Sequence, residues 1–387
     1  MQEITVVGGG LGGLVAAITA AEAGVGVRLM EQKRHLGGRA RTTETPFRAN
    51  WGPHVIYSDG PLLRWLDERG LARPATRAPL TAKFLFRIDG RARRVPPASM
   101  IRALLCLRRR AAPVDMTFTE WASGLVGEEH ARRLAAFIGV ATFDHDPGRL
   151  SAAFVNERLT RTTTVPPTVR YMPGGWATMI ERLAERAHSL GVRIETDAKV
   201  DALPEGPVIL ALPLDTARTM TGDPGLVATG TRTTLLDVGV QQSRRVPFIV
   251  SDLDAPGWAE TYSIPDQSLA PTGHHLIQAQ AGLRPGDSLE EGVIRLEELL
   301  DIGYTNWRQN EVWRRRARVD NESGALDLPG QTWRDRPAID RGDGVFVVGD
   351  MVAAPGLLSE VSHESALRAV AAITRSHHRS VLASGRS

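Results

Sequence analysis

The chain has 387 residues, of which 24% are charged and 42% hydrophobic, a composition typical of a soluble globular protein and unlike that of collagen-like, disulfide-scaffold or disordered chains. Its 47 Lys and Arg residues nearly balance its 44 Asp and Glu residues, so no concentrated basic field predicts a nucleic-acid partner. Cys106 is the only cysteine, which excludes disulfides, thiolate zinc sites and a CxxC redox centre. No apolar run reaches the about 18 residues of a membrane helix, and no basic leader precedes the first strand pattern, so we expect a cytoplasmic protein.

The first elements form a unit typical of dinucleotide binding. The short apolar run Ile4–Val7 predicts a strand, and it ends at the glycine-rich turn Gly8-Gly9-Gly10-Leu11-Gly12-Gly13. An apolar helical pattern follows as far as Gly24, and a second predicted strand over 25–30 ends at Glu31. This order of strand, glycine turn, helix, strand and acid predicts a βαβ unit that holds a dinucleotide.

Each part of this unit has a separate expected role. Gly8 permits the tight turn, Gly10 lets the backbone approach a pyrophosphate, and Gly13 lets the helix pack against the strand. The helix N-terminus offers N–H groups and the positive end of its dipole to the phosphates. Glu31 can accept both hydroxyls of an adenosine ribose, and an acid there argues against a 2′-phosphorylated cofactor. An ordinary strand-to-helix turn without a ligand is the alternative interpretation.

The residues after Glu31 distinguish among dinucleotides. They read Gln32-Lys33-Arg34-His35-Leu36-Gly37-Gly38-Arg39, and here the sequence resembles the flavin-dependent amine oxidase and phytoene desaturase superfamily. The resemblance implies that this turn closes over the pyrophosphate of FAD. Gly37 and Gly38 free the backbone, and Arg39 can place its guanidinium against phosphate oxygens.

The resemblance continues through the middle of the chain. Asn50-Trp51-Gly52-Pro53-His54-Val55-Ile56 is similar to the segment that runs beside the isoalloxazine ring in this family. The turn over 171–176 is similar to the family's Pro-x-Gly-Gly turn, and a helix is expected after it, at about 177–190. Val200 matches a valine whose backbone binds adenine, and 208–213 matches the buried strand that re-enters the nucleotide domain.

The last similar segment lies near the C-terminus. A buried strand pattern over 344–348 ends in Gly349-Asp350, and a predicted helix runs from about Ser359 through Ala372. The resemblance implies that Asp350 brings a carboxylate to the ribityl chain and that the helix directs its N-terminus at the flavin pyrimidine. A helix dipole there stabilises negative charge on a reduced flavin.

The predicted fold is α/β, with a Rossmann-like FAD-binding domain of the GR2 flavoprotein type and an inserted α+β substrate domain. We expect residues 1–57, 168–214 and 335–387 to form the FAD-binding domain, and residues 58–167 and 215–334 to form the substrate domain. The first insertion is helix-rich, and the second has strand patterns at 235–240 and 275–280. The latter alternates like a strand with one face in solvent, and 289–300 is an amphipathic helix.

The run from Met100 to Arg110 has two interpretations. It is apolar with clustered arginines at its end, so it could be an interfacial helix that gives access to lipid-borne substrates. It could instead be an ordinary helix of the substrate domain whose cationic end complements the helix dipole. We favour the second interpretation, because a single short segment anchors weakly.

The site residues follow from the turn chemistry and the resemblance. His54 is the candidate catalytic residue: it could orient substrate, act as a base, carry a covalent flavin link, or only pack against the ring. No cysteine lies near the C-terminal flavin segment, so non-covalent FAD is expected. The residues predicted to bind FAD are Gly8, Gly10, Leu11, Gly12, Gly13, Glu31, Gln32, Gly38, Arg39, Gly52, Pro53, His54, Val55, Val200, Gly349, Asp350 and Leu358.

The predicted reaction is dehydrogenation of a small or isoprenoid-like, largely apolar substrate by hydride transfer to flavin N5, with oxygen or a quinone-like acceptor. Amine oxidases of the superfamily carry a lysine near flavin N5, and this chain has none in 215–387. The run over 262–273 looks closer to the desaturase branch. The alternatives are an amine or amino-acid oxidase with a non-standard site, a redox-neutral flavoprotein isomerase, and a binding protein that has lost its flavin.

Overall fold

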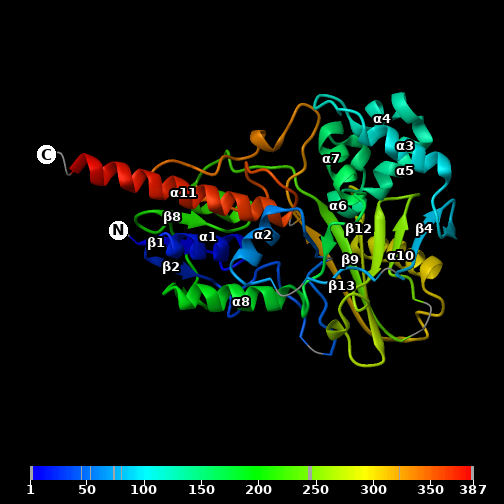
Figure 1. Cartoon of the computed structure of the whole chain (residues 1–387), viewed down its shortest axis with the longest axis horizontal. Helices are drawn as coiled ribbons and strands as arrows, with labels where there is room; N and C mark the ends of the chain where they lie inside the picture. The colour runs from blue at the N-terminus through cyan, green and yellow to red at the C-terminus, as the bar shows by residue number, and fades with distance from the viewer. Residues whose placement is uncertain are drawn as a thin grey trace.

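The computed structural model describes residues 3–44, 46–52, 54–72, 75–79, 81–242, 246–321 and 323–384. Two large sheets lie at opposite ends of the molecule (Figure 1). Both chain termini lie at the end of the first sheet, and the second sheet with a group of short helices occupies the other end. The predicted α/β class is confirmed, and the helices and strands below show how the residues of the site are positioned.

The first sheet is parallel and has five strands in the order β14-β8-β1-β2-β7. The strands are β1 (Ile4–Val7), β2 (Val27–Met30), β7 (Arg193–Glu195), β8 (Val208–Leu210) and β14 (Val345–Val347). Short runs of branched apolar residues suit strands that are covered on both faces. Because the strands are parallel, the ends of β1, β2 and β14 meet at one edge, where a dinucleotide binds in this class of fold.

Helices cover both faces of this parallel sheet. The core on one face joins β1 to α1 (Leu11–Glu22), α2 (Pro61–Glu68), α8 (Gly175–Ser189) and α11 (Ser359–Ser384). On the other face, α9 (Leu214–Thr221) packs against β8 and β14. The helix predicted to end at Ala372 continues to Ser384, and Figure 1 shows it extending beyond the sheet.

The second sheet is mixed and has seven strands in the order β13-β9-β12-β11-β10-β4-β5. Its strands are β4 (Phe84–Ile88), β5 (Arg91–Arg93), β9 (Arg232–Gln241), β10 (Ile249–Asp252), β11 (Gly257–Thr261), β12 (His274–Gly282) and β13 (Glu311–Asp320). The sequence pattern predicts β9 and β12, and both lie inside the sheet, away from its edges. All pairs are antiparallel except β10 with β4.

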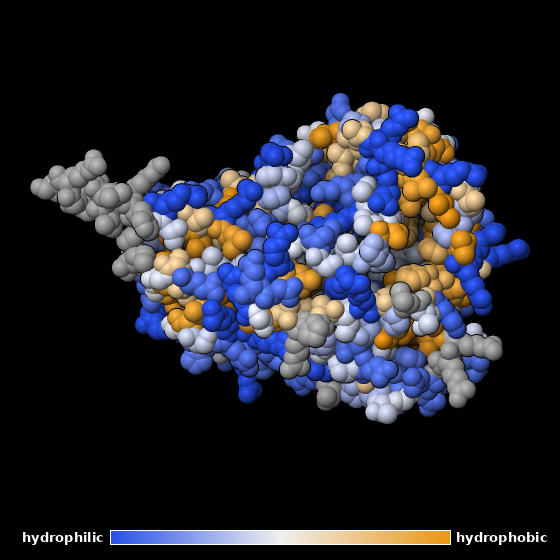
Figure 2. Space-filling model, in the orientation of Figure 1, coloured by the Kyte–Doolittle hydropathy of each residue, from blue (hydrophilic) through white to orange (hydrophobic). Residues whose placement is uncertain are grey.

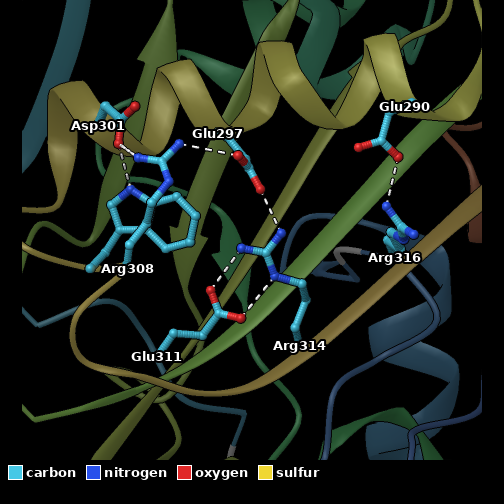
Figure 3. Close-up of polar contacts among 8 residues, drawn as sticks. Glu290, Glu297, Asp301, Arg308, Glu311, Arg314 and Arg316 are labelled. Atoms are coloured by element: carbon cyan, nitrogen blue, oxygen red, sulfur yellow. Dashed lines mark hydrogen bonds and ion pairs between the residues drawn. The ribbon is translucent and has the colours of Figure 1, made fainter.

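The amphipathic helix α10 (Leu289–Gly303) covers one face of the second sheet with its apolar side. Its outer side faces β13 through a network of ion pairs, in which Glu297 accepts from both Arg308 and Arg314 (Figure 3). Arg314 also pairs with Glu311 at 2.8 Å. Side-chain hydrogen bonds and burial act on Arg314 in opposite directions, and the carboxylates raise its pKa overall. The network therefore holds α10 to the strand that completes the sheet edge.

Five helices pack together beyond the second sheet. They are α3 (Ala98–Arg108), α4 (Phe118–Val126), α5 (Glu128–Phe137), α6 (Gly139–Thr142) and α7 (Ala152–Thr162). A two-stranded ladder of β3 (Ile56–Tyr57) and β6 (Val169–Arg170) lies between them and the parallel sheet in the chain order. The helix-rich character expected for this insertion is present, but it also supplies β4 and β5 to the second sheet.

The helix α3 buries Met100, Ala103 and Leu107 and leaves Ile101 and Leu105 exposed, at 41% and 45%. Figure 2 shows apolar surface around this region of the molecule. Among the described residues, no helix combines the length and hydropathy needed to cross a membrane. The packing of α3 against α4, α5 and α7 is that of an ordinary domain helix with a partly apolar outer face.

The expectation that β12 has one face in solvent is wrong. In β12 every residue from His275 to Gly282 is buried, including Gln278 and Gln280. The alternation of polar and apolar residues is real, because Ile277 and Ala279 pack under α10 while the glutamines point to the opposite face. That opposite face does not meet water, since the segment around Asn50 covers it.

Candidate active and cofactor site

The glycine turn joins β1 to α1 with very little space between backbones. Gly8 has a φ of 105°, and a Cβ at this position would lie 2.3 Å from Ala211 O. A Cβ on Gly13 would lie 1.9 Å from Gly8 O. Only glycine fits either position, because one needs a left-handed backbone and the other a close contact between helix and strand.

Gly10 and Gly12 differ from these two glycines. A Cβ on Gly10 would meet only Gly37 O, at 3.9 Å, and a Cβ on Gly12 would meet nothing closer than 3.7 Å. Gly10 is the N-cap of α1, and no side chain caps that helix. No described side chain therefore caps the first N–H groups of α1, which is the arrangement that binds a phosphate.

The second turn lies directly against the first. Gly37 N donates to Gly9 O at 2.8 Å, and Gly10 and Gly37 form an isolated bridge. Glu31 is buried between them, and its carboxylate accepts from Gly9 N at 2.8 Å and Lys33 N at 2.9 Å. These contacts fix the carboxylate at the end of β2, beside the gap that both turns border.

Arg39 joins the N-terminal glycine turns to the segment that follows β14. Its Nη1 and Nη2 donate to the two carboxylate oxygens of Asp350 at 2.6 and 2.9 Å. Asp350 follows β14, and Gly349 N is held by Ser365 Oγ of α11 at 3.0 Å. The residues that the resemblance assigns to the pyrophosphate and to the ribityl chain of FAD thus form one hydrogen-bonded pair.

The N-terminus of α11 borders the same region. Leu358 precedes the helix with a φ of 55°, which is rare for a leucine. Glu360 in the first turn accepts from Arg161 at 2.6 and 2.7 Å and caps Leu357 N at 3.0 Å. Arg161 on α7 thereby fixes the start of α11 against the helical part of the molecule.

His54 lies in a pocket next to these turns. Its Nδ1 contacts Gly52 O at 2.6 Å, and its ring meets Trp176 edge-on with the centroids 4.6 Å apart. Because a carbonyl oxygen only accepts, Nδ1 carries the proton and Nε2 is an acceptor. The residue keeps some exposure, but desolvation of the ring, helped by Arg39 and Arg315, lowers its pKa to about 4. His54 is therefore neutral at pH 7.

A row of polar side chains crosses the second sheet on the face opposite α10. Arg315, Asp237, Gln278 and Glu260 occupy paired positions on four neighbouring strands. Gln278 Nε2 donates to Asp237 Oδ1 at 2.9 Å and to Asn50 O at 3.0 Å, and Arg315 Nη2 donates to Asn50 O at 2.5 Å. This network holds the start of the segment that carries His54.

Glu260 is the least satisfied member of this row. Burial raises its pKa to about 7, although the hydroxyls of Tyr171 and Tyr262 act to lower it. Those hydroxyls lie near the carboxyl group, but Glu260 Oε1 and the Tyr262 hydroxyl lack hydrogen-bonding geometry. Gln280 Oε1, near Gly52, also has no partner among the described residues. Such unsatisfied buried atoms are typical of a face that contacts a ligand.

The pocket at His54 is lined mainly by aromatic and apolar side chains. Its lining is Asn50, His54, Tyr171, Met172, Trp176, Tyr262, Asp266 and Leu269. The turn over 171–176 contributes three of these residues, and the segment that follows β11 contributes three more, Tyr262, Asp266 and Leu269. The sequence singles out His54, the turn over 171–176 and the run over 262–273, but it does not show that they line one pocket. It does not predict the polar row, whose residues come from separate strands; the alternating glutamines of β12 are a signal for it, but their pattern predicts a solvent-facing side.

The other predicted residues have these positions. Leu11, Gly12 and Gly13 are the first residues of α1. A Cβ on Gly38 would lie 3.6 Å from the Cα of Gly10, and Gln32 is exposed. Val200 packs partly buried against the core next to β8, and Gly52 and Val55 flank His54. Pro53 lies outside the described residues. Except for Pro53, the predicted residues near the turns, Asp350 and His54 all lie around one region.

Known proteins resemble the chain in two ways. Residues 6–69 match the family model for an NAD(P)-binding Rossmann-like domain. A carotenoid 3,4-desaturase of Haloarcula japonica is 51% identical over 53 residues, which are 13% of this chain and 11% of that protein. A 4,4'-diapolycopen-4-al dehydrogenase of Metabacillus indicus is 38% identical over 73 residues, which are 19% of this chain and 15% of that protein. The matched segments thus span 11 to 15% of the length of these relatives.

Solved structures resemble the chain over nearly its whole length. An oxidoreductase from Methanosarcina mazei has a TM-score of 0.77 at 17% identity, over 95% of this chain and 99% of that one. Reduced UDP-galactopyranose mutase has a TM-score of 0.73 at 15% identity, over 97% and 96% of the two chains. Cyclohexylamine oxidase from Brevibacterium oxydans has a TM-score of 0.73 at 14% identity, over 97% and 99%.

At these identities the structural likeness establishes the fold, and the sequence matches add the N-terminal nucleotide-binding unit. The recurrence of both features agrees with the motifs read from the sequence. The chain is therefore similar to a carotenoid desaturase in its N-terminal unit, and its overall fold is that of solved oxidoreductases and oxidases such as cyclohexylamine oxidase.

Proposed function

We propose that the protein is an FAD-dependent oxidoreductase that dehydrogenates a small or isoprenoid-like organic substrate, with oxygen or a quinone-like compound as electron acceptor. The observation that carries this proposal is the pairing of Arg39 with Asp350 beside the two glycine turns. This pair belongs to the same region as the uncapped N-terminus of α1, which would bind phosphate, and the carboxylate of Glu31, which would bind a ribose.

The residues present fit a flavin dinucleotide. The N–H groups of α1 and the turn at Gly37 would hold the pyrophosphate. A Cβ on Gly10 would enter that space, so glycine suits this position. Glu31 would exchange its bond to Gly9 N for ribose hydroxyls, and Asp350 would accept from the ribityl chain. When bound, the flavin would supply the hydride acceptor.

The chain's own groups orient the substrate and exclude water. The network of Arg315, Asp237 and Gln278 fixes the segment at Asn50 and so the position of His54. The aromatic lining of the pocket at His54 keeps water out and favours an apolar skeleton. The ring of His54 is neutral and its Nε2 carries no proton, so Nε2 can accept a hydrogen bond or a proton from a group bound there.

The cofactor proposal is tested by the absorbance spectrum of the purified protein before and after acid precipitation. A flavin spectrum that appears in the supernatant supports non-covalent FAD, and colour retained in the pellet indicates a covalent link and makes His54 the first residue to map. A protein that is colourless and does not bind added FAD contradicts the proposal. The Glu31→Ala, Arg39→Ala double variant should lose its flavin, and a double variant purified with full flavin would overturn this site.

The reaction is tested by anaerobic bleaching of the flavin with alkene precursors and with amines. Bleaching by alkene precursors that needs an acceptor for turnover supports dehydrogenation of a carbon skeleton. Peroxide released with an amine would instead identify an amine oxidase. Activity that appears only after reduction by dithionite would identify a redox-neutral isomerase.

A further inference from the structure

A second pocket has Asp350 in its lining and lies between the parallel sheet and the helical part of the molecule. The loop before β14, the start of α11 and the helices α6 and α7 surround it. Its lining is Ala141, Thr142, Phe154, Arg158, Ser323, Gly324, Ala325, Leu326, Arg336, Asp350, Leu358 and Val361. Because Asp350 and Leu358 belong to the proposed flavin site, a molecule in this pocket would lie next to the flavin.

Arg158 on α7 is the unusual residue of this pocket. Its side chain is 4% exposed, and its Cζ lies 3.3 Å from the centroid of the Phe154 ring. Among described residues, its guanidinium makes one hydrogen bond, from Nη1 to Phe154 O at 3.1 Å, and Nε is buried without a partner. Burial lowers the pKa of Arg158 to about 10, so it remains charged at pH 7.

The neighbouring cations are all compensated. Arg336 donates from Nε to Asp327 Oδ1 at 2.8 Å, and Arg161 pairs with Glu360 and with Asp59. The carboxylate nearest to Arg158 is that of Glu157, at 3.7 Å, and its side chain is 62% exposed. Asp350, the carboxylate in the lining, is paired with Arg39, so among the described residues the pocket contains one buried positive charge in excess.

A charge buried in this way is unfavourable for the protein alone. Its desolvation is offset only by a partner with good geometry, and an apolar residue of similar size is often more stable at such a position. A guanidinium offers a planar fork that matches the two oxygens of a carboxylate. A single excess charge matches a carboxylate of charge −1 better than a phosphate of charge near −2.

We propose that Arg158 binds a carboxylate group of the substrate, and that the substrate is accordingly an organic acid with an apolar skeleton. Phe154, Ala141, Ala325 and Leu326 surround the guanidinium with apolar surface on which carbon atoms next to the carboxylate would pack. This inference rests on the proposed function, because it places the substrate beside the flavin. It distinguishes this protein from enzymes whose substrates are uncharged hydrocarbons.

The test compares wild type with Arg158→Met, Arg158→Lys and the control Arg64→Met, which removes an exposed arginine of α2. The probes are benzoate and hexanoate, with benzamide and hexanamide as uncharged counterparts and inorganic phosphate as a second anion. The readouts are the absorbance spectrum of the flavin-loaded protein and the thermal midpoint of both loaded and flavin-free protein.

We expect at least one carboxylate to bind wild type and the control equally, and both amides to bind far more weakly. Arg158→Met should weaken carboxylate binding by about tenfold or more, the usual loss when a charge-assisted hydrogen bond is removed. Arg158→Lys should give an intermediate loss and serves if the methionine variant does not fold. Without a probe, Arg158→Met should melt no lower than wild type.

Three outcomes would overturn the inference. One is the absence of carboxylate binding to wild type, and another is equal binding to wild type and Arg158→Met. The third is tight binding of phosphate at Arg158 in preference to carboxylates. The flavin content tests the proposed function separately. Protein that does not bind FAD contradicts that function, while its thermal midpoint still measures carboxylate binding. FAD-loaded protein that does not bind carboxylates contradicts only the role of Arg158.

Discussion

Arg39 and Asp350 are 311 residues apart in the chain and form a bidentate ion pair. Arg39 follows the second strand of the parallel sheet, and Asp350 follows the strand at its edge. The pair closes the sheet edge at which the glycine turns lie. Both residues are therefore positioned toward a ligand by each other as well as by the backbone.

Asp350→Asn should weaken FAD binding by about tenfold, because the amide offers one acceptor oxygen where the carboxylate offers two charged ones. The fold should persist, since Arg39 is 38% exposed and can turn to solvent. Titration of flavin-free protein with FAD, followed by fluorescence, measures the change. Unchanged affinity would mean that Asp350 serves only as the partner of Arg39.

The glycines of the first turn should separate into two classes. Gly13→Ala should reduce the free energy of unfolding by 2 kcal/mol or more, on the order of a severe steric mutation, because its Cβ would overlap Gly8 O. Gly10→Ala should fold normally but lose FAD affinity, because its Cβ would enter the space proposed for the phosphates. Urea denaturation and FAD titration measure the two effects.

Gly12→Ala is the matched control for these variants, because nothing lies within 3.7 Å of its Cβ position. It should keep both stability and flavin, with a small gain from the better helix propensity of alanine. A Gly10→Ala variant that bound FAD like Gly12→Ala would show that the pyrophosphate lies elsewhere.

His54 should make stability depend on pH. Burial lowers its pKa to about 4 in the folded protein, from 6.5 in the unfolded chain, so the unfolded state binds the proton first as the pH falls. The stabilisation present above pH 6.5 should be lost progressively toward pH 4. His54→Gln should flatten this part of the curve of unfolding free energy against pH. An equally steep curve for the variant would assign the dependence to other groups.

Glu260 should have the opposite pH dependence. Burial raises its pKa to about 7 from 4.5, so the folded state holds its proton more tightly. Stability from this group should be complete below pH 4.5 and lost as the pH rises through 7. Glu260→Gln should therefore stabilise the protein more at pH 8 than at pH 5, by roughly 2 kcal/mol. Urea unfolding at both pH values measures the difference, and equal effects would show that Glu260 titrates normally.

The ion pairs between α10 and β13 should contribute modestly to stability. Glu297 contacts both Arg308 and Arg314 (Figure 3), so Glu297→Gln should reduce the free energy of unfolding by about 0.5 to 1 kcal/mol. The loss should shrink in 1 M salt, because these side chains are partly exposed. Glu290→Gln removes an exposed pair with Arg316 and should change stability less.

Local patterns were sufficient for the nucleotide-binding half. β1, the glycine turn and the start of α11 depend on short apolar runs and on glycines whose backbone has no alternative, so neighbouring residues alone specify them. Strands such as β13 were not predicted, because its run of arginines resembles a surface segment until it pairs with β9. The division into two domains and the individual FAD contacts remain predictions.

The class of fold, the dinucleotide-type turn and the residues that flank it can be predicted from the chain alone, because these follow from the order and spacing of nearby residues. The meeting of distant groups followed from the tertiary packing: Arg39 with Asp350, Gln278 with Asn50, and Arg158 with a pocket whose one described carboxylate, Asp350, is already paired with Arg39. A side chain's burial and its lack of a partner depend on elements far away in the chain. Charge compensation and desolvation are properties of a packed environment, which no local pattern contains.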